Sequence, residues 1–321
     1  MKILFLVLDR QRVILDRLYD SVVAAASDCD LRRLADAEQR DLRRYFREKD
    51  IAPERYDRIV LFLRFKRLSR QPLFVRALPN LVILEHDACQ NYYPCKYQGR
   101  FSAFYRRLPA ARVLVSGWRV AERLRGEGVD ALFVPKGYDQ TLLRNLGGAR
   151  DIELGFLGST GSDRYRARRA MLEAIKAREP SLMATRTESG ADYCAMLNRI
   201  RFFVGADVGM GEYMIKNYEA MACGCVLCTF DQGEAENRAL GFVDMENLVL
   251  YRDIDELQAK LRCLRADPAR ADRIAAAGQA LVEHEYSYAH IGARIVTVLA
   301  PELRPNPAPG RLERMRLALR L

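Results

Sequence analysis

The chain alternates along most of its length between two kinds of hydrophobic pattern. Short runs of consecutive apolar residues predict buried strands, whereas apolar residues spaced three or four positions apart predict helices that bury one face. Strands are expected at residues 2–8, 56–63, 80–88, 111–117, 130–139, 151–159, 201–207 and 225–230. Helical patterns such as "VILDRLYDSVVAAA" lie between them. Strand, helix and strand at this spacing indicate βαβ units and parallel sheets.

The pattern stops and restarts around residues 139–151, where "NLGGAR" is typical of a hinge. We therefore expect an α/β fold with two Rossmann-like domains, at residues 1–140 and 150–300. A proline-rich and then basic tail follows at 301–321. Sheets of this kind bind ligands outside the carboxyl ends of their strands, so a site is expected in the cleft between the two halves.

Two common nucleotide-binding motifs are missing from the expected loops. The first strand is followed by "DRQRVILD" instead of G-x-G-x-x-G, which argues against an NAD enzyme. The loop "GSTGSDRYR" has no Walker lysine followed by Ser or Thr, which argues against a P-loop kinase.

The apolar runs and the cysteines indicate a cytoplasmic protein. No apolar run reaches the roughly 18 to 20 residues that a membrane helix needs, and "MKILFLVLD" lacks the cleavage site of a signal peptide. Cys225 and Cys228 form a C-x-x-C sequence, but they lie in an expected strand and would point to opposite faces. They are interpreted as small buried hydrophobes and not as a metal or redox site.

The stretch "GMGEYMIKNYEAMACGC" combines an anion-binding helix start with two carboxylates. Gly209 and Gly211 allow a ligand to approach the backbone closely, and the free N–H groups of the following helix favour a diphosphate. Glu212 and Glu219 would accept hydrogen bonds from sugar hydroxyls. The combination predicts a nucleotide sugar; the alternative is a capping glutamate on a solvated helix face.

Residues 110–300 resemble the group-1 glycosyltransferases, a GT-B family, including its spore-maturation-protein-like branch. The segment "EAMACGCVL" carries the resemblance most clearly, together with "LGFLGS" and "ENLVLYRDIDELQAKL". It implies two Rossmann-like domains facing across a cleft, with Glu219 on the ribose of the donor and Lys216 as the basic residue three positions earlier. The family spacing places the first glutamate at Gly211, so Glu212 lies one position late for a contact with the donor sugar.

Further candidate residues lie at the ends of expected strands. The resemblance implies that His86 lines the donor sugar, and the adjacent Asp87 is a candidate base for an inverting reaction. Arginine forks suit phosphate oxygens, so the loop after the strand at 151–159 is expected to contact the diphosphate. The candidates there are Ser159, Thr160, Arg164 and Arg168.

The net charge of +10 and two basic, aromatic segments at 62–76 and 90–107 suggest an anionic acceptor. Aromatic rings stack on sugars and arginines pair with phosphates, so a phosphorylated or lipid-linked saccharide is expected there. Nucleic acid would be bound by the same composition, but no nucleic-acid motif is present in the sequence. The D-x-D sequences at 28–30 and 253–255 lie away from the expected cleft loops, so neither a metal nor a cofactor is expected.

These expectations combine into one functional hypothesis with two alternatives. The hypothesis is a retaining, metal-independent glycosyltransferase that extends a cell-envelope glycan such as lipopolysaccharide. A nucleotide-sugar epimerase of the same fold and a non-catalytic sugar- or nucleotide-binding protein are the alternatives. The tail at 310–321 predicts a short basic amphipathic helix that either lies on an anionic membrane at the inner face or packs on the first domain.

Overall fold

The computed structural model describes residues 1–9, 15–161 and 165–305. It divides into two compact units. Unit 1 comprises residues 1–134 and the C-terminal residues from Gly292, and unit 2 comprises Pro135–Ile291. The domain division expected from the sequence placed all of 150–300 in the second domain, whereas most of the last helix belongs to unit 1. Arg164 and the tail at 310–321 lie outside the described residues.

Unit 1 is built on a six-stranded parallel sheet with the order β2-β1-β3-β4-β5-β6. Its strands are β1 (Lys2–Leu8), β2 (Asp28–Leu34), β3 (Arg58–Phe62), β4 (Leu81–Glu85), β5 (Arg112–Val115) and β6 (Asp130–Phe133). Strand β2 was missed by the sequence analysis. Its sequence, DCDLRRL, is largely polar because it forms the edge of the sheet and is mostly part-exposed.

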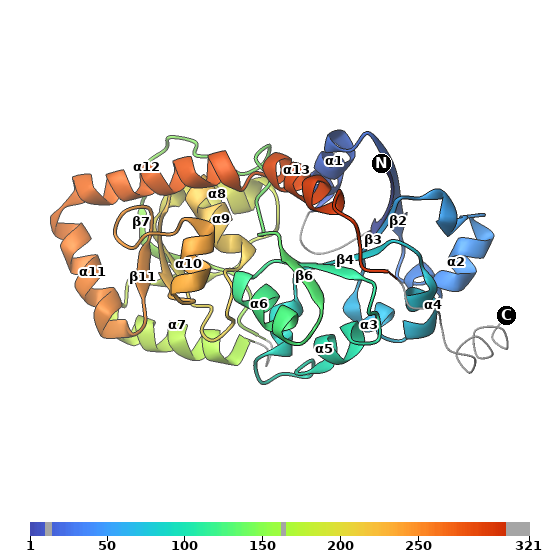
Figure 1. Ribbon diagram of the computed structural model, residues 1–321. Coiled ribbons are helices and arrows are strands. Elements are labelled where there is room, and N and C mark those ends of the chain that lie inside the picture. The colour runs from blue at the N-terminus through green and yellow to red at the C-terminus, as the bar shows by residue number, and fades with distance from the viewer. Residues whose placement is uncertain (10–14, 162–164, 306–321) are drawn as a thin grey trace. The chain divides into compact units, whose positions relative to one another are not determined.

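Helices cover both faces of this sheet, with α1 and α13 on one face and α3, α5 and α6 on the other (Figure 1). The helices of the unit are α1 (Asp16–Ala25), α2 (Leu42–Glu48), α3 (Phe65–Leu68), α4 (Pro72–Ala77), α5 (Arg100–Tyr105), α6 (Trp118–Gly126) and α13 (Tyr288–Leu299). Short 3₁₀ turns occur at η1 (Glu38–Arg40), η2 (Pro53–Arg55) and η3 (Ala88–Asn91).

Helix α13 is fixed to unit 1 at two places. A Cβ at Gly292 would lie 2.7 Å from the backbone carbon of Ser21, so only glycine lets α13 pack this closely on α1. At its other end, the last carbonyls of the helix accept hydrogen bonds from two arginines. Arg58 donates to the carbonyl of Leu299 at 2.7 Å, and Arg112 donates to that of Val298 at 3.3 Å and, just beyond the helix, to that of Glu302 at 2.8 Å. Cations at a helix C-terminus are also favoured by the helix dipole.

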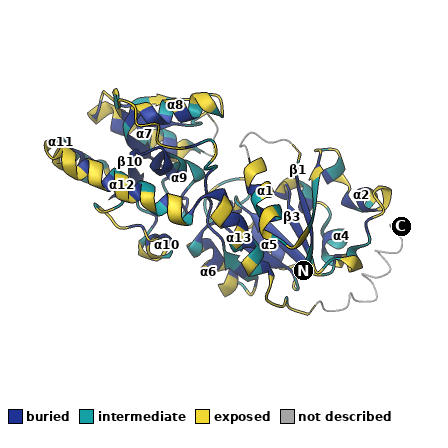
Figure 2. Cartoon of the chain, turned by 90° about the horizontal axis from the view of Figure 1, so that it is seen from above, coloured by how far each residue is buried: buried dark blue, intermediate teal, exposed yellow. Residues whose placement is uncertain are grey.

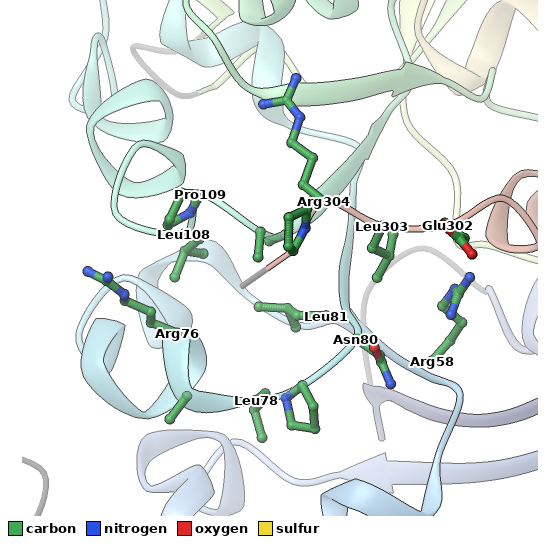
Figure 3. A pocket seen from close by; sticks show the side chains of 15 residues that line it. Arg58, Arg76, Leu78, Asn80, Leu81, Leu108, Pro109, Glu302, Leu303 and Arg304 are labelled. Carbon is green, nitrogen blue, oxygen red and sulfur yellow. The ribbon is translucent and has the colours of Figure 1, made fainter. Parts of the chain in front are cut away.

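A pocket of about 370 Å³ lies beside these arginines, at the amino ends of β3, β4 and β5 (Figure 3). The loops before β4 and β5 form its walls, and Leu303 and Arg304 run along it. Ligand sites of such sheets lie at the carboxyl ends of the strands, which is the opposite edge. This pocket is therefore separate from the predicted site residues His86 and Asp87, which follow β4.

Unit 2 contains a second, five-stranded parallel sheet with the order β11-β10-β9-β7-β8. Its strands are β7 (Ile152–Leu157), β8 (Met183–Thr185), β9 (Ile200–Gly205), β10 (Val226–Phe230) and β11 (Val249–Tyr251). Its helices are α7 (Arg166–Arg178), α8 (Ala191–Arg199), α9 (Ile215–Ala222), α10 (Glu234–Leu240), α11 (Ile254–Ala266) and α12 (Pro268–Glu285). Figure 1 places α8, α9 and α12 on one face of the sheet, and α7 and α11 on the other.

Local sequence signals explain where the last helices begin and end. Asp253 and Asp267 cap α11 and α12 through hydrogen bonds from the amides of Glu256 and Arg270, and Pro268 fits the first turn of α12. Helix α12 ends at Glu285, and α13 begins at Tyr288. The strands are mostly buried, whereas α11 and α12 expose their outer sides (Figure 2).

The cysteines of β10 are buried thiols. Cys225 and Cys228 are free and almost fully buried. Burial raises the pKa of the Cys225 thiol to about 12, so it stays protonated and unreactive. This agrees with their interpretation as small hydrophobes. No helix in the described part of the chain is both long and apolar enough to span a bilayer.

The hydrogen bonds from Arg58 and Arg112 to the end of α13 yield a stability prediction. Replacing Arg112 by Met keeps the apolar stem but removes its hydrogen bonds to backbone carbonyls and leaves the nearly buried Asp130 without its ion pair. We expect a loss of about 2–4 kcal/mol in the free energy of unfolding, measured by urea denaturation, with faster amide exchange in α13. Arg55→Met, at an exposed position, is the control. Equal stability of the two variants would contradict the role of Arg112 in fixing α13.

Candidate functional site

The loop between β9 and α9 lies at the carboxyl end of the central strand of unit 2. It is held in place by Gln232, which is 3% exposed. The Gln232 side chain accepts from the amide of Gly211 at 2.9 Å and donates to the carbonyl of Asp207 at 2.8 Å. Gly209 and Gly211 have φ angles of 72° and 73°, in the left-handed region that favours glycine. The loop backbone is therefore well defined before any ligand binds.

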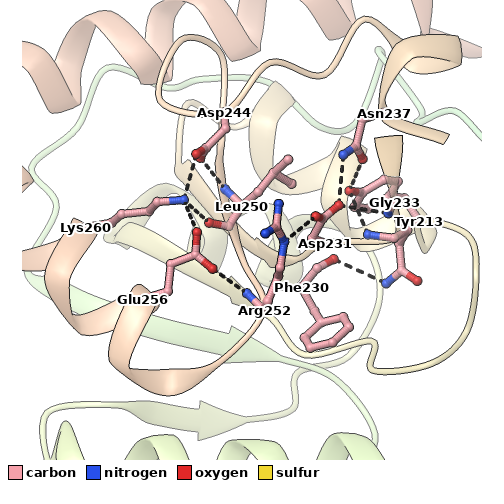
Figure 4. A network of polar contacts seen from close by, with 11 residues as sticks. Tyr213, Phe230, Asp231, Gly233, Asn237, Asp244, Leu250, Arg252, Glu256 and Lys260 are labelled. Atoms are coloured by element: carbon pink, nitrogen blue, oxygen red, sulfur yellow. Dashed lines mark hydrogen bonds and ion pairs between the residues drawn. The ribbon is translucent and has the colours of Figure 1, made fainter. Parts of the chain in front are cut away.

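A second set of polar contacts supports the same loop from the β10–α10 connection (Figure 4). The hydroxyl of the buried Tyr213 donates to Oδ1 of Asn237 at 2.5 Å. Asn237 in turn donates to Asp231 at 2.9 Å, and the amide of Gly233 donates to the same carboxylate oxygen. Gln232 and Gly233 of the β10–α10 connection therefore both take part in the contacts that support the loop.

Arg168 links the loop after β9 to the loop after β7. Its guanidinium is 3% exposed and donates through two nitrogens to one oxygen of the equally buried Asp207. A third nitrogen donates to the carbonyl of Ser159 at 3.1 Å. The guanidinium also lies 4.2 Å from the ring centroid of Tyr165. The arginine predicted to contact the diphosphate is therefore occupied in holding two loops, while Ser159 and Thr160 remain part-exposed on the first of them.

Lys216 is the cation that the structure places at the start of α9. Its ammonium donates to the carbonyl of Leu157, the last residue of β7, at 2.7 Å. A Cβ on Gly158 would lie 2.7 Å from this nitrogen, so the lysine occupies the space that glycine leaves open. Burial lowers the pKa of Lys216, and the neighbouring carboxylate of Glu219 opposes this shift.

Glu219 lies one turn further along α9 and is part-exposed. The hydroxyl of Tyr193 in α8 donates to its Oε2 at 2.8 Å. Burial raises the pKa of Glu219, while Lys216 and the Tyr193 hydroxyl act in the opposite direction. Among the described residues, only one oxygen of this carboxylate has a hydrogen-bond partner, and the ammonium of Lys216 lies with it at the carboxyl ends of β7 and β9. The N-terminus of α9 lies with them, and none of the described side chains caps it.

Glu212 has a different environment from Glu219. It precedes α9 in an irregular segment and is 1% exposed. Its Oε1 is 2.6 Å from the ammonium of Lys136, which is itself 5% exposed. This contact favours a structural role for Glu212 over the expected contact with a donor sugar.

The predicted site residues of unit 1 follow β4. The ring of His86 packs against Phe62, with centroids 4.9 Å apart, and the backbone carbonyl of His86 accepts a long hydrogen bond of 3.4 Å from Ser116. Asp87 is exposed, and its amide donates to the buried Glu85 at 2.8 Å. These two residues belong to unit 1, whereas the other predicted site residues that the structure describes belong to unit 2.

Five of the nine aromatic residues in the two segments expected to bind an acceptor are part of the core, whereas Phe74, Tyr92, Tyr93 and Tyr97 are part-exposed. Phe65 and Phe101 stack on each other with ring centroids 3.8 Å apart. Both rings are buried, as are those of Phe104 and Tyr105, so the expectation that they contact a sugar is wrong. The intervening basic residues are exposed: Lys66, Arg70, Lys96 and Arg100.

Three residues of this site were missed by the sequence analysis. Asp207 had a usable signal, because it is a carboxylate close after a long apolar strand. Lys136 and Tyr193 had none, because their partners are 76 and 26 residues away in the sequence. The two D-x-D sequences have structural partners: Asp30 bonds Arg32 and Tyr56, and Asp253 caps α11. The described residues include no group of three His, Cys, Asp or Glu side chains that could hold a metal ion.

Comparisons with known proteins show similarities in sequence family and in fold. Residues 143–297, just under half of the chain, match a family described as glycosyl transferase-like. Sucrose-phosphate synthase from Thermosynechococcus elongatus superposes with a TM-score of 0.68 at 13% identity, covering 92% of this chain and 98% of that one. HepE from Anabaena, solved in complex with UDP, superposes with a TM-score of 0.65 at 15% identity, covering 94% and 100%. No curated protein sequence matches the chain.

The chain therefore has the GT-B fold. The family match over unit 2 and the fold together support a glycosyltransferase.

The Lys136–Glu212 pair generates a prediction that separates a structural from a catalytic role. Glu212→Gln removes the carboxylate charge 2.6 Å from the buried ammonium of Lys136 and is expected to destabilise unit 2 by about 3 kcal/mol. The double variant Lys136→Met, Glu212→Gln removes both charges and should recover much of this loss. Stability is measured by urea denaturation. Full stability of Glu212→Gln together with lost activity would instead favour the catalytic role.

Proposed function

We propose that this protein is a metal-independent glycosyltransferase that transfers a sugar from a nucleoside-diphosphate sugar to a cell-envelope saccharide. The observation that carries the proposal is the grouping of Lys216, Glu219 and the open N-terminus of α9 at the carboxyl ends of β7 and β9. This grouping lies within the part of the chain that matches the glycosyl transferase-like family.

The chemistry of the proposed donor site follows from these groups. The ammonium of Lys216 and the amides at the start of α9 would stabilise the negative charge that develops on the departing diphosphate. Ser159 and Thr160 lie on the adjacent loop, where their hydroxyls are available to phosphate oxygens. The carboxylate of Glu219 would accept hydrogen bonds from ribose hydroxyls. Arg168 contributes by positioning the two loops, because its nitrogens already have partners inside the protein.

UDP is the nucleotide to test first. HepE was solved with UDP and with UDP-glucose, and its fold superposes on nearly the whole chain. The proposal extends to retention of anomeric configuration, which is implied by the resemblance to group-1 enzymes. His86 and Asp87 would act from unit 1, lining the donor sugar or serving as a base.

The proposed acceptor is a phosphorylated or lipid-linked saccharide such as lipopolysaccharide. It is supported by the net charge of +10 and by the exposed basic residues around α3 and α5. A lipid-linked acceptor would agree with a peripheral location on an anionic inner membrane surface, to which the basic residues of the 301–321 segment would contribute.

The function is tested by binding and by turnover. UDP should raise the melting temperature and bind measurably by calorimetry, ahead of GDP and ADP, and EDTA should not abolish binding. With UDP-sugars, nucleotide diphosphate should be released only when an acceptor is present. Interconversion of donor sugars without acceptor would identify an epimerase, and binding without any turnover would identify a binding protein. Failure of every nucleotide to bind would overturn the proposal.

Gly158 provides a sharper test of the role of Lys216. Gly158→Ala places a Cβ 2.7 Å from the Lys216 ammonium and 2.9 Å from the end of the Phe156 ring. We expect the flexible lysine to move away and the ring to shift slightly while the fold remains intact. We expect UDP binding to weaken by about 1–2 kcal/mol, measured by calorimetry, with little change in melting temperature. Gly148→Ala is the matched control, since a Cβ there meets nothing within 4 Å. Unchanged UDP affinity in Gly158→Ala would show that Lys216 does not contact the phosphates.

A further inference from the structure

Tyr193 contacts the carboxylate that the proposed function assigns to the donor. It lies in the first turn of α8, and its hydroxyl donates to Oε2 of Glu219 in α9 at 2.8 Å. The two helices lie on the same face of the unit 2 sheet (Figure 1). The tyrosine ring itself is part-exposed, with the ammonium of Lys216 at 5.7 Å from its centroid. The Tyr193 hydroxyl therefore contacts Glu219 although Tyr193 does not belong to the loops after β7 and β9 that form the site.

We propose that Tyr193 is a positioning residue that holds one oxygen of Glu219 and thereby presents the other oxygen to a ribose hydroxyl of the nucleotide. The proposal rests on the proposed function, because it requires that Glu219 bind the ribose. A carboxylate on a helix surface has several rotamers, and a fixed second oxygen avoids the loss of side-chain entropy when the ligand binds. Tyr193 would thus favour ribonucleotides over their deoxy analogues without touching the ligand.

The charged and titratable groups around Glu219 determine how its ionisation depends on Tyr193. Lys216 faces it from its own helix, Tyr193 faces it from α8, and the thiol of Cys223 lies beyond the end of α9. Burial raises the pKa values of the Cys223 thiol and of the Tyr193 phenol, so both stay neutral. The Tyr193 hydroxyl accordingly remains a donor, and Lys216 is the one cation among these three neighbours.

The pH dependence has a definite sign. Burial raises the pKa of Glu219, and the hydrogen bond from Tyr193 lowers it. Removing the hydroxyl must therefore raise this pKa further. A ribose hydroxyl donates to the ionised carboxylate, so UDP binding weakens as the pH falls through the pKa of Glu219. In Tyr193→Phe this weakening should begin at a higher pH than in the wild type.

The experiment measures the affinities of UDP, 2′-deoxy-UDP and 3′-deoxy-UDP for the wild type, Tyr193→Phe and Glu219→Gln by calorimetry between pH 5 and 8. We expect Tyr193→Phe to weaken UDP binding about tenfold, the effect of one lost hydrogen bond to a charged group. The affinity for at least one deoxy analogue should fall much less in this variant, because that analogue lacks the hydroxyl that Glu219 would bind. The phenyl ring is retained, so the melting temperature should stay close to that of the wild type.

Tyr56→Phe is the matched control. The hydroxyl of Tyr56 also donates to a carboxylate, that of Asp30 at 2.8 Å, but it does so in unit 1. This variant should leave the affinity for UDP and its pH dependence unchanged. Equal effects of Tyr56→Phe and Tyr193→Phe would contradict a specific role for Tyr193.

The outcomes separate this inference from the function on which it rests. Weak UDP binding by Glu219→Gln, with Tyr193→Phe indistinguishable from the wild type at every pH, would overturn the role of Tyr193 and leave the proposed function standing. If Tyr193→Phe lowered the affinities for UDP and for both deoxy analogues equally, the role of Tyr193 would also be overturned, because the effect would be unrelated to the ribose. Wild-type affinity in Glu219→Gln would overturn the assignment of Glu219 to the ribose, and with it the role of Tyr193, but not nucleotide binding by the protein. No nucleotide binding by any form would overturn both proposals.

Discussion

The buried ion pair between Arg168 and Asp207 is the contact on which the site of unit 2 depends. A single guanidinium bonds the carboxylate after β9 and a carbonyl in the loop after β7. Withdrawing two charges from water costs several kcal/mol per ion, so such a pair contributes little net stability. Its physical consequence is geometric: the two loops that approach a ligand from adjacent strands cannot move independently. The glutamine contacts of Gln232 extend the same constraint to the backbone of Gly211.

This constraint divides the polar residues of the site into two groups. Arg168, Glu212 and Gln232 are nearly fully buried and have their partners inside the protein. Lys216 and Glu219 are part-exposed, and burial shifts the pKa of each toward its neutral form. A bound nucleotide would compensate that shift, since phosphate favours the ammonium and ribose hydroxyls favour the carboxylate. The first group holds the loops in place, and the second group would provide the interactions that change when a nucleotide binds.

The sequence predicted the fold where the signal is local. Apolar runs identified the central strands, and the helix start after β9 was found from its glycines. Three features could not be found in this way. Strand β2 is a polar edge, the end of α13 is fixed by Arg58 and Arg112 more than 180 residues earlier in the chain, and the partners of Arg168 and Glu219 come from other elements. The expectation that Phe65 and Phe101 contact a sugar was also wrong, because aromatic residues have the same sequence pattern when they stack on each other in a core.

Glu212 lies one position later than the group-1 spacing predicts, and its contact with Lys136 offers a structural reason for this shift. Glu212 stands one position after the place that group-1 spacing assigns to a donor-sugar contact, and Gly211 occupies that place with a positive φ. Had Glu212 faced a ligand, Lys136 would be a buried ammonium without a carboxylate, which is a costly state. The positive φ of Gly211, the position of Glu212 and the burial of Lys136 are therefore explained together by this ion pair. Recognition of the donor sugar would then fall to other groups, while Glu219 would remain the proposed contact of the ribose.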